Sequence, residues 1–174
     1  MSEGTIMWGR ALRWIGLIAA AVPLAALAAH VLELPNKLRL DGPLWLAVQQ
    51  NLYRGWGPLV APFEIAAIAA AWLLVCLARQ RPPIPAWTLA AAVCLSALLA
   101  EFFLVVEPVN VAVAGWTATT LPADWPDYRR QWEIGHAVGF VLALVAFCAL
   151  LRAAFLETRA AALRQQTLET PDEA

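Results

Sequence analysis

The sequence predicts an all-α protein: an integral membrane four-helix bundle, up-down-up-down, with a short interfacial helix between helices 1 and 2. Of its 174 residues, 61% are hydrophobic and only 14% are charged, and the mean hydropathy is +0.64. A soluble domain typically carries about 25% charged residues, so this chain has too little polar surface for a soluble globule of its size. The apolar residues form four runs of membrane length. Within lipid such runs must be helical, because a helix satisfies its own backbone hydrogen bonds.

The first helix is predicted over about residues 11–34. The run from Trp14 to Leu32 has no formal charge, and Pro35 is expected to end the helix. Ala26-Leu27-Ala28 resembles a signal-cleavage site, but the run is longer than a usual signal core, which favours a retained helix. In the connection that follows, apolar residues recur at helical spacing and predict the interfacial helix: Leu44, Trp45, Val48, Leu52 and Tyr53.

The second and third helices are predicted over about 56–79 and 84–107, and each run holds one acidic residue. A tight turn, Arg79-Gln80-Arg81-Pro82-Pro83, is expected between them.

The fourth helix is predicted over about 127–156, around the uncharged run from Ile134 to Leu151. Residues 1–156 then form a single transmembrane domain. Residues 157–174 are expected to be a polar cytoplasmic tail, frayed at first and disordered after Thr170.

Charge predicts the orientation in the membrane. Seven arginines fall on one side of the four runs: Arg10, Arg13, Arg79, Arg81, Arg152, Arg159 and Arg164. Five cations fall on the other: Lys37, Arg39, Arg54, Arg129 and Arg130. The positive-inside rule therefore places both termini in the cytoplasm of a multi-pass protein of the plasma (bacterial inner) membrane. On the outer side an aromatic belt is expected: Trp45, Trp56, Trp116, Trp125 and Trp132.

Charge and cysteine content exclude some functions. A net charge of −1 predicts no attraction to nucleic acid. The three cysteines lie inside apolar runs without a Cys-x-x-Cys pair, which indicates packing rather than redox chemistry. The sequence leaves the oligomeric state open.

The polar residues of the four helices are predicted to meet at one depth. At about 1.5 Å per residue, His30, Glu64, Glu101 and His136 fall within one or two turns of a common level near the outer face. Ionisable residues within a membrane usually mark a functional site.

Both histidines belong to i, i+3 pairs with a carboxylate on the same helix face: His30 with Glu33, and Glu133 with His136. Two such pairs and two single glutamates are the ligand set of dimetal four-helix bundles. The predicted metal ligands are therefore His30, Glu33, Glu64, Glu101, Glu133 and His136, and oxygen and imidazole donors favour iron or manganese.

Simpler interpretations stay open. Glu33 and Glu107 can pair with interfacial cations, and Glu64 can be a first-turn carboxylate after Pro62. Glu101 and Glu107 face different directions on one helix, so the two are not expected to bind one metal ion.

A sequence pattern runs from the end of helix 3 into helix 4: Glu107-Pro108-Val109-Asn110, Trp116, Leu121-Pro122, Trp125, Arg129, Arg130, Trp132, Glu133 and His136. It resembles the anthrone oxygenase-like (DUF1772) family of small four-helix membrane proteins. The resemblance implies, for some members, O2-dependent oxidation of an anthrone-type aromatic substrate, often without a cofactor.

Together these observations predict an integral-membrane oxidoreductase, an oxygenase acting on a small hydrophobic or aromatic substrate. Without a metal, His136 backed by Glu133 is the candidate general base. The residues expected to bind substrate are Asn110, Trp116, Arg129 and Trp132.

Two alternatives come from other classes. His30 and His136 could be the axial ligands of a b-type haem. The chain could also be a non-enzymatic membrane subunit or a proton-coupled transporter, with Glu64 and Glu101 as a proton relay.

Overall fold

The computed structural model describes residues 3–78 and 84–169, and every regular element in these ranges is helical, which confirms the all-α prediction. The elements are α1 (Glu3–Lys37), α2 (Gly42–Asn51), α3 (Trp56–Ala78), α4 (Ile84–Glu101), the π-helix η1 (Phe102–Val106), α5 (Glu107–Ala114) and α6 (Trp125–Glu169). Within the described residues, four segments are long and apolar enough to cross a membrane: Trp8–Lys37, Trp56–Leu77, Ile84–Ala114 and Trp125–Leu163.

The helix ends differ in places from the expected ranges. Helix α1 runs two residues past Pro35, because a proline in the last turn removes one hydrogen bond without ending the helix at once. Helix α6 continues to Glu169, well into the expected tail. The predicted turn at residues 79–83 and the segment after 169 lie outside the described residues.

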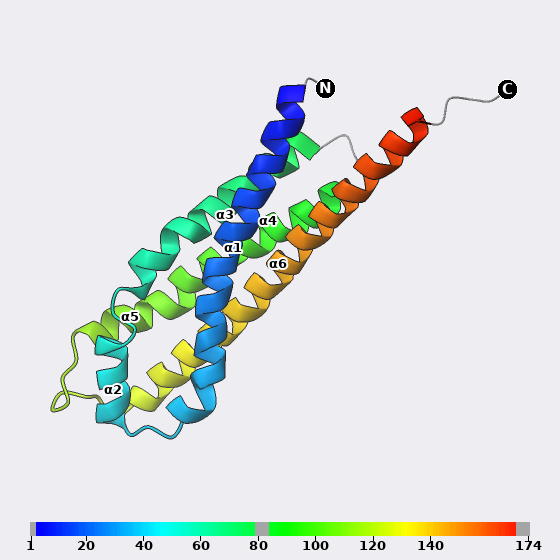
Figure 1. Ribbon diagram of the computed structural model, residues 1–174. Coiled ribbons are helices and arrows are strands. Elements are labelled where there is room, and N and C mark those ends of the chain that lie inside the picture. The colour runs from blue at the N-terminus through cyan, green and yellow to red at the C-terminus, as the bar shows by residue number, and fades with distance from the viewer. Residues whose placement is uncertain (1–2, 79–83, 170–174) are drawn as a thin grey trace.

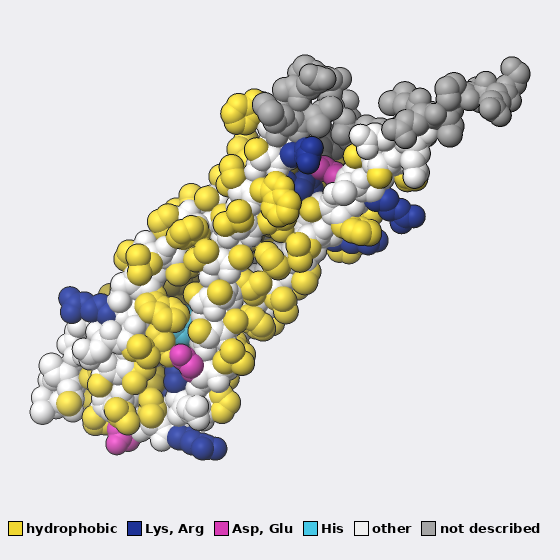
Figure 2. Space-filling model, viewed as in Figure 1, with side chains coloured by type: hydrophobic (Ala, Val, Ile, Leu, Met, Phe, Trp, Pro, Cys, Tyr) yellow, Lys and Arg dark blue, Asp and Glu magenta, His cyan; other side chains and the backbone are white. Residues whose placement is uncertain are grey.

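The four long segments form a ring in which α1 and α4 each pack against both α3 and α6. Figure 1 shows an elongated bundle with the N-terminus of α1 and the C-terminal end of α6 at one end, and α2 and α5 at the other. On the face seen in Figure 2, hydrophobic side chains cover most of the length, and lysine and arginine gather towards the two ends.

Small residues bring the helices together in the half of the bundle near the termini. A Cβ added at Gly16 of α1 would lie 3.3 Å from Cβ of Ala70 on α3, so the two backbones approach closely. Such close approach is typical of helix packing in lipid. The buried cluster is dominated by alanine: Leu17, Ala19, Ala20, Ala67, Ala71, Ala91, Ala92, Leu95, Ala146, Ala149 and Leu150.

Aromatic residues fill the opposite half. Helix α2 begins at a capped N-terminus, where the Asp41 side chain accepts from Leu44 N–H at 2.9 Å. A Cβ added at Gly42 would lie 2.9 Å from Cε2 of the Trp125 ring, so a larger residue there would have to displace that ring. The buried cluster beneath α2 consists of Trp45, Leu46, Tyr53, Val106, Val109, Val113 and Trp132.

Two tryptophans expected in a membrane-facing belt belong to this cluster. Trp45 and Trp132 are 0% and 3% exposed, so their rings pack inside the bundle. Their positions near the ends of helices did not indicate that the rings point into the bundle.

Two ion pairs connect α1 with α6, one near each end of the bundle. Arg13 pairs with Glu157, and Lys37 pairs with Glu133 at 2.7 Å. The pairs are 24 residues apart on each helix, so α1 and α6 run antiparallel. At 1.5 Å per residue this is about 36 Å, slightly more than a hydrocarbon core.

Candidate functional site

The structure brings the two histidines together. His30 of α1 and His136 of α6 have ring centroids 4.2 Å apart, at an interplanar angle of 61°. Both are buried, at 5% and 9% exposure. Their contact follows from the antiparallel packing of α1 and α6, which places the two residues at one level.

Aromatic rings from three other positions surround His30. Its centroid lies 4.6 Å from that of Tyr53, 5.2 Å from Trp56 and 4.9 Å from Trp132. Tyr53 and Trp56 lie on either side of Gly55, whose φ of +87° is readily adopted only by glycine. The sharp turn between α2 and α3 thus places both rings against the same histidine.

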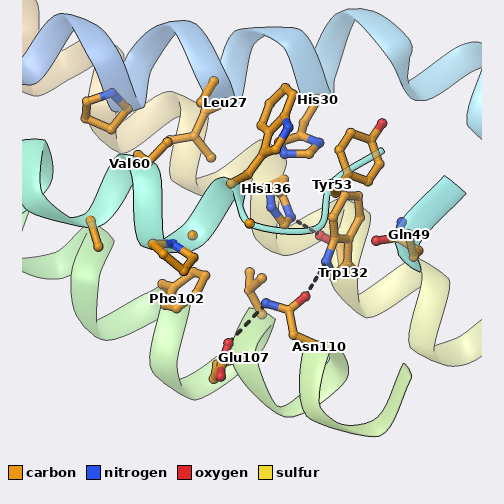
Figure 3. Close-up of a pocket in the computed structure, with 18 of the residues that line it drawn as sticks. Leu27, His30, Gln49, Tyr53, Val60, Phe102, Glu107, Asn110, Trp132 and His136 are labelled. Carbon is orange, nitrogen blue, oxygen red and sulfur yellow. Dashed lines mark hydrogen bonds between the residues drawn. The ribbon is translucent and has the colours of Figure 1, made fainter. Parts of the chain in front are cut away.

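A chain of hydrogen bonds fixes the orientation of His136 (Figure 3). Its Nδ1 lies 2.8 Å from the backbone oxygen of Trp132, and since a carbonyl can only accept, Nδ1 carries the proton. The Trp132 indole N–H donates to Asn110 Oδ1 at 2.9 Å, and Asn110 Nδ2 donates to Glu107 Oε2 at 3.1 Å. Neutral His136 therefore keeps a lone pair on Nε2, as a general base or a metal ligand requires.

The acidic partners of the two histidine pairs are bound elsewhere. Glu133, 5% exposed, forms the ion pair with Lys37, and Lys37 Nζ also lies 4.7 Å from the Trp132 ring centroid. Glu33 accepts a hydrogen bond from the Tyr53 hydroxyl. Burial and this hydrogen bond raise the pKa of Tyr53. The i, i+3 spacing thus does not make either carboxylate a partner of its histidine.

The two mid-helix glutamates face the interior. A Cβ added at Gly135 of α6 would lie 2.9 Å from Glu101 Oε1, so this carboxylate rests against α6 beside His136. Glu64 of α3 lies within electrostatic range of Glu101. Among the described residues, Glu64 Oε1, Glu101 Oε1 and His30 Nδ1 are buried and have no hydrogen-bond partner.

All four residues of the predicted polar layer line one pocket of about 810 Å³, bounded by α1, α3, the α4–η1–α5 segment and α6. Figure 3 shows its residues, with Leu27, Val60 and Phe102 at one end and Trp132 and Asn110 at the other. Glu107, Asn110, Trp116 and Trp132 also line it. The walls are mainly apolar or aromatic, with polar groups at a few points, as is typical of a small-molecule site.

Arg129 has a different place. Its guanidinium donates to the Leu40 and Lys37 carbonyls at 2.9 and 3.4 Å and lies 4.6 Å from the Trp125 ring centroid. It holds the α1–α2 connection against α6 and is not part of the pocket lining.

No group of three or more His, Cys, Asp or Glu side chains among the described residues is arranged to hold a metal ion. Of the six predicted ligands, Glu33 is bound by the Tyr53 hydroxyl and Glu133 by Lys37.

Sequence reasoning did not find three features of the site: the position of Lys37 over Trp132, the Tyr53–Glu33 hydrogen bond, and the π-helix after Glu101. Lys37 follows Glu33 by four residues, and that spacing could have indicated that it shares the face of Glu33 and His30.

Compared with known proteins, the chain matches no family model, no curated protein and no solved structure.

Proposed function

We propose that the four long segments cross the plasma membrane up-down-up-down, with both termini in the cytoplasm and α2 lying at the outer interface. The seven-to-five distribution of basic residues supports this orientation. The pocket then opens near the outer face, where a hydrophobic substrate dissolved in the bilayer can reach it.

We further propose that the protein is an integral-membrane oxidoreductase that oxidises a flat, hydrophobic aromatic substrate with O2. The observation that supports this best is the state of His136: Nδ1 is bound to the Trp132 carbonyl, and Nε2 is left as a base beside an aromatic pocket. The resemblance to the anthrone oxygenase-like family points to the same class of reaction.

The proposed reaction needs only a base and a site that excludes water. His136 Nε2 takes a proton from an acidic C–H of the substrate, and the carbanion adds O2. The peroxide anion regains the proton, and loss of water leaves a carbonyl, so that a CH2 group and O2 become C=O and H2O. The Trp132 carbonyl, rather than Glu133, orients the base in this scheme and stabilises the imidazolium.

A metal-dependent form of this function would have to use iron or manganese at His30, His136, Glu64 and Glu101. No three of these side chains are arranged to hold an ion in the described part of the chain, so the metal-free form is favoured. A haem between the histidines is not favoured, since rings with centroids 4.2 Å apart leave no space for a porphyrin.

The test is oxygen uptake by the full chain in non-ionic detergent, with anthrone as substrate. We expect His136→Ala to lower the rate by about a hundredfold or more, as loss of a general base does. Ser96→Ala, at a hydroxyl bonded to Trp72 outside the pocket, is the control. Activity that survives exhaustive chelation supports the metal-free form, and activity restored only by iron or manganese supports the other. An unchanged rate in His136→Ala would contradict both forms.

A further inference from the structure

Buried charges in this bundle fall into two groups. Arg13 is paired with Glu157, and Lys37 is paired with Glu133. Glu64 and Glu101 have no cation partner among the described residues, although one oxygen of each is buried. A buried carboxylate without a partner is costly, so these two call for a group that the chain itself does not supply.

A third acceptor lies in the same pocket. His30 is only 5% exposed and lines the pocket. Its Nδ1 has no hydrogen-bond partner in the described part of the chain. The three unpartnered atoms come from three helices: His30 from α1, Glu64 from α3 and Glu101 from α4. The two carboxylates are acceptors and carry negative charge when ionised, and His30 Nδ1 is an acceptor in the tautomer that is protonated at Nε2.

The remaining walls fit a cation attached to an apolar body. Of the rings around His30, those of Trp132 and Tyr53 already have Lys37 Nζ 4.7 and 5.5 Å from their centroids. The Trp56 ring also lines the pocket, and aromatic rings of this kind attract organic cations. Leu27, Leu98 and Phe102 line the same space and offer only apolar contact.

We propose that Glu64, Glu101 and His30 form a subsite for an organic ammonium group, so that the pocket binds an aromatic or otherwise apolar amine. A primary ammonium has three N–H donors and one positive charge. It can donate to acceptors of this pocket, and its charge offsets one of the two carboxylate charges through charge-assisted hydrogen bonds. This rests on the proposed function only in taking the same pocket as the binding site, and it names a class of ligand that the pocket binds.

The test measures binding without turnover, by calorimetric titration of the full chain in a non-ionic maltoside. The probes are 2-phenylethylammonium and the neutral, similarly shaped propylbenzene. We expect saturable binding of the ammonium at least tenfold tighter than that of propylbenzene. Equal binding of the two by the unaltered protein would overturn the proposal, whatever any variant does.

Variants locate the site. Glu64→Gln and Glu101→Gln keep side-chain shape, and each is expected to weaken ammonium binding about tenfold or more while leaving propylbenzene unchanged. The matched control is Asp127→Asn, an acid-to-amide change at an exposed residue paired with Arg130. Loss of affinity in the control equal to that in the pocket variants would also overturn the proposal.

The ammonium could belong to a free amine or to a lipid headgroup. Added phosphatidylethanolamine that displaces 2-phenylethylammonium identifies the lipid as the natural source, and lack of displacement identifies a free amine; both support the subsite. A protein that binds the ammonium but takes up no oxygen would reject the oxidase proposal and leave this one standing.

Discussion

At the scale of single residues, the level of a side chain along the bundle could be predicted, but the residue that it contacts on another helix could not. The rise per residue along each helix was enough to expect His30 and His136 at one level, and the structure places their rings in contact. The partner of Glu133 could not be predicted, because spacing shows where a side chain leaves its own helix but not which residue of the next helix it meets. Lys37 took that place, 96 residues earlier in the chain.

The Tyr53–Glu33 contact predicts a pH dependence. Because burial and the hydrogen bond raise the pKa of Tyr53, the neutral phenol is favoured in the folded state. Its stabilising contribution should be complete below pH 10, the ordinary pKa, and decline as the pH rises above it. We expect the difference in unfolding midpoint between the unaltered protein and Tyr53→Phe to be constant from pH 8 to 9 and smaller at pH 11. A difference that stays the same at pH 11 would contradict this.

At the scale of elements, the least predictable feature is η1. The apolar run predicted one continuous helix over residues 84–107. A π-turn has no strong sequence signal, so η1 could not be expected from the sequence. In an unbroken α-helix the nine steps from Glu101 to Asn110 would place the two side chains about 180° apart. The wider π-turn of η1 takes up one extra residue, so the rotation from Glu101 to Asn110 equals that of eight α-helical steps. The angle between the two side chains is then about 80°, and both line the pocket.

Two single-residue deletions test this role. Leu104 lies in η1 and is 76% exposed, so removing it should convert the π-turn to α-helix and leave the faces on both sides in place. Val93 is 51% exposed and lies within regular α-helix in α4. Its deletion should rotate the residues before it by about 100° about the helix axis, relative to those after it. We expect the unfolding midpoint to fall far more for the Val93 deletion, measured by circular dichroism. Equal losses would show that η1 does not set the register.

At the scale of the whole molecule, composition and the length of the hydrophobic runs were sufficient to predict the number and kind of long helices. Four apolar runs predicted four long helices, and within residues 3–78 and 84–169 the structure has them. The closed ring also follows from physics, because helices whose polar residues face inward must shield them from lipid. The pocket could not be predicted, since its volume depends on which side chains leave space unfilled between the helices.

The proposed membrane orientation is tested with single cysteines in a background lacking Cys76, Cys94 and Cys148. A cysteine at Thr119, in the exposed connection between α5 and α6, should react with a membrane-impermeant maleimide in intact cells. A cysteine at Thr158, beyond the opposite end of the bundle core, should react only after the membrane is broken. The reverse pattern would invert the topology and place the pocket towards the cytoplasm.

The two ion pairs between α1 and α6 have a consequence for biogenesis. During synthesis α1 enters the membrane first, carrying Arg13 and Lys37, while Glu157 and Glu133 arrive only with the last helix. Until α6 is in place, neither cation has the carboxylate with which the folded chain pairs it. The pairing of the first helix is therefore completed only by the last, and a product truncated before α6 keeps two cations without their partners.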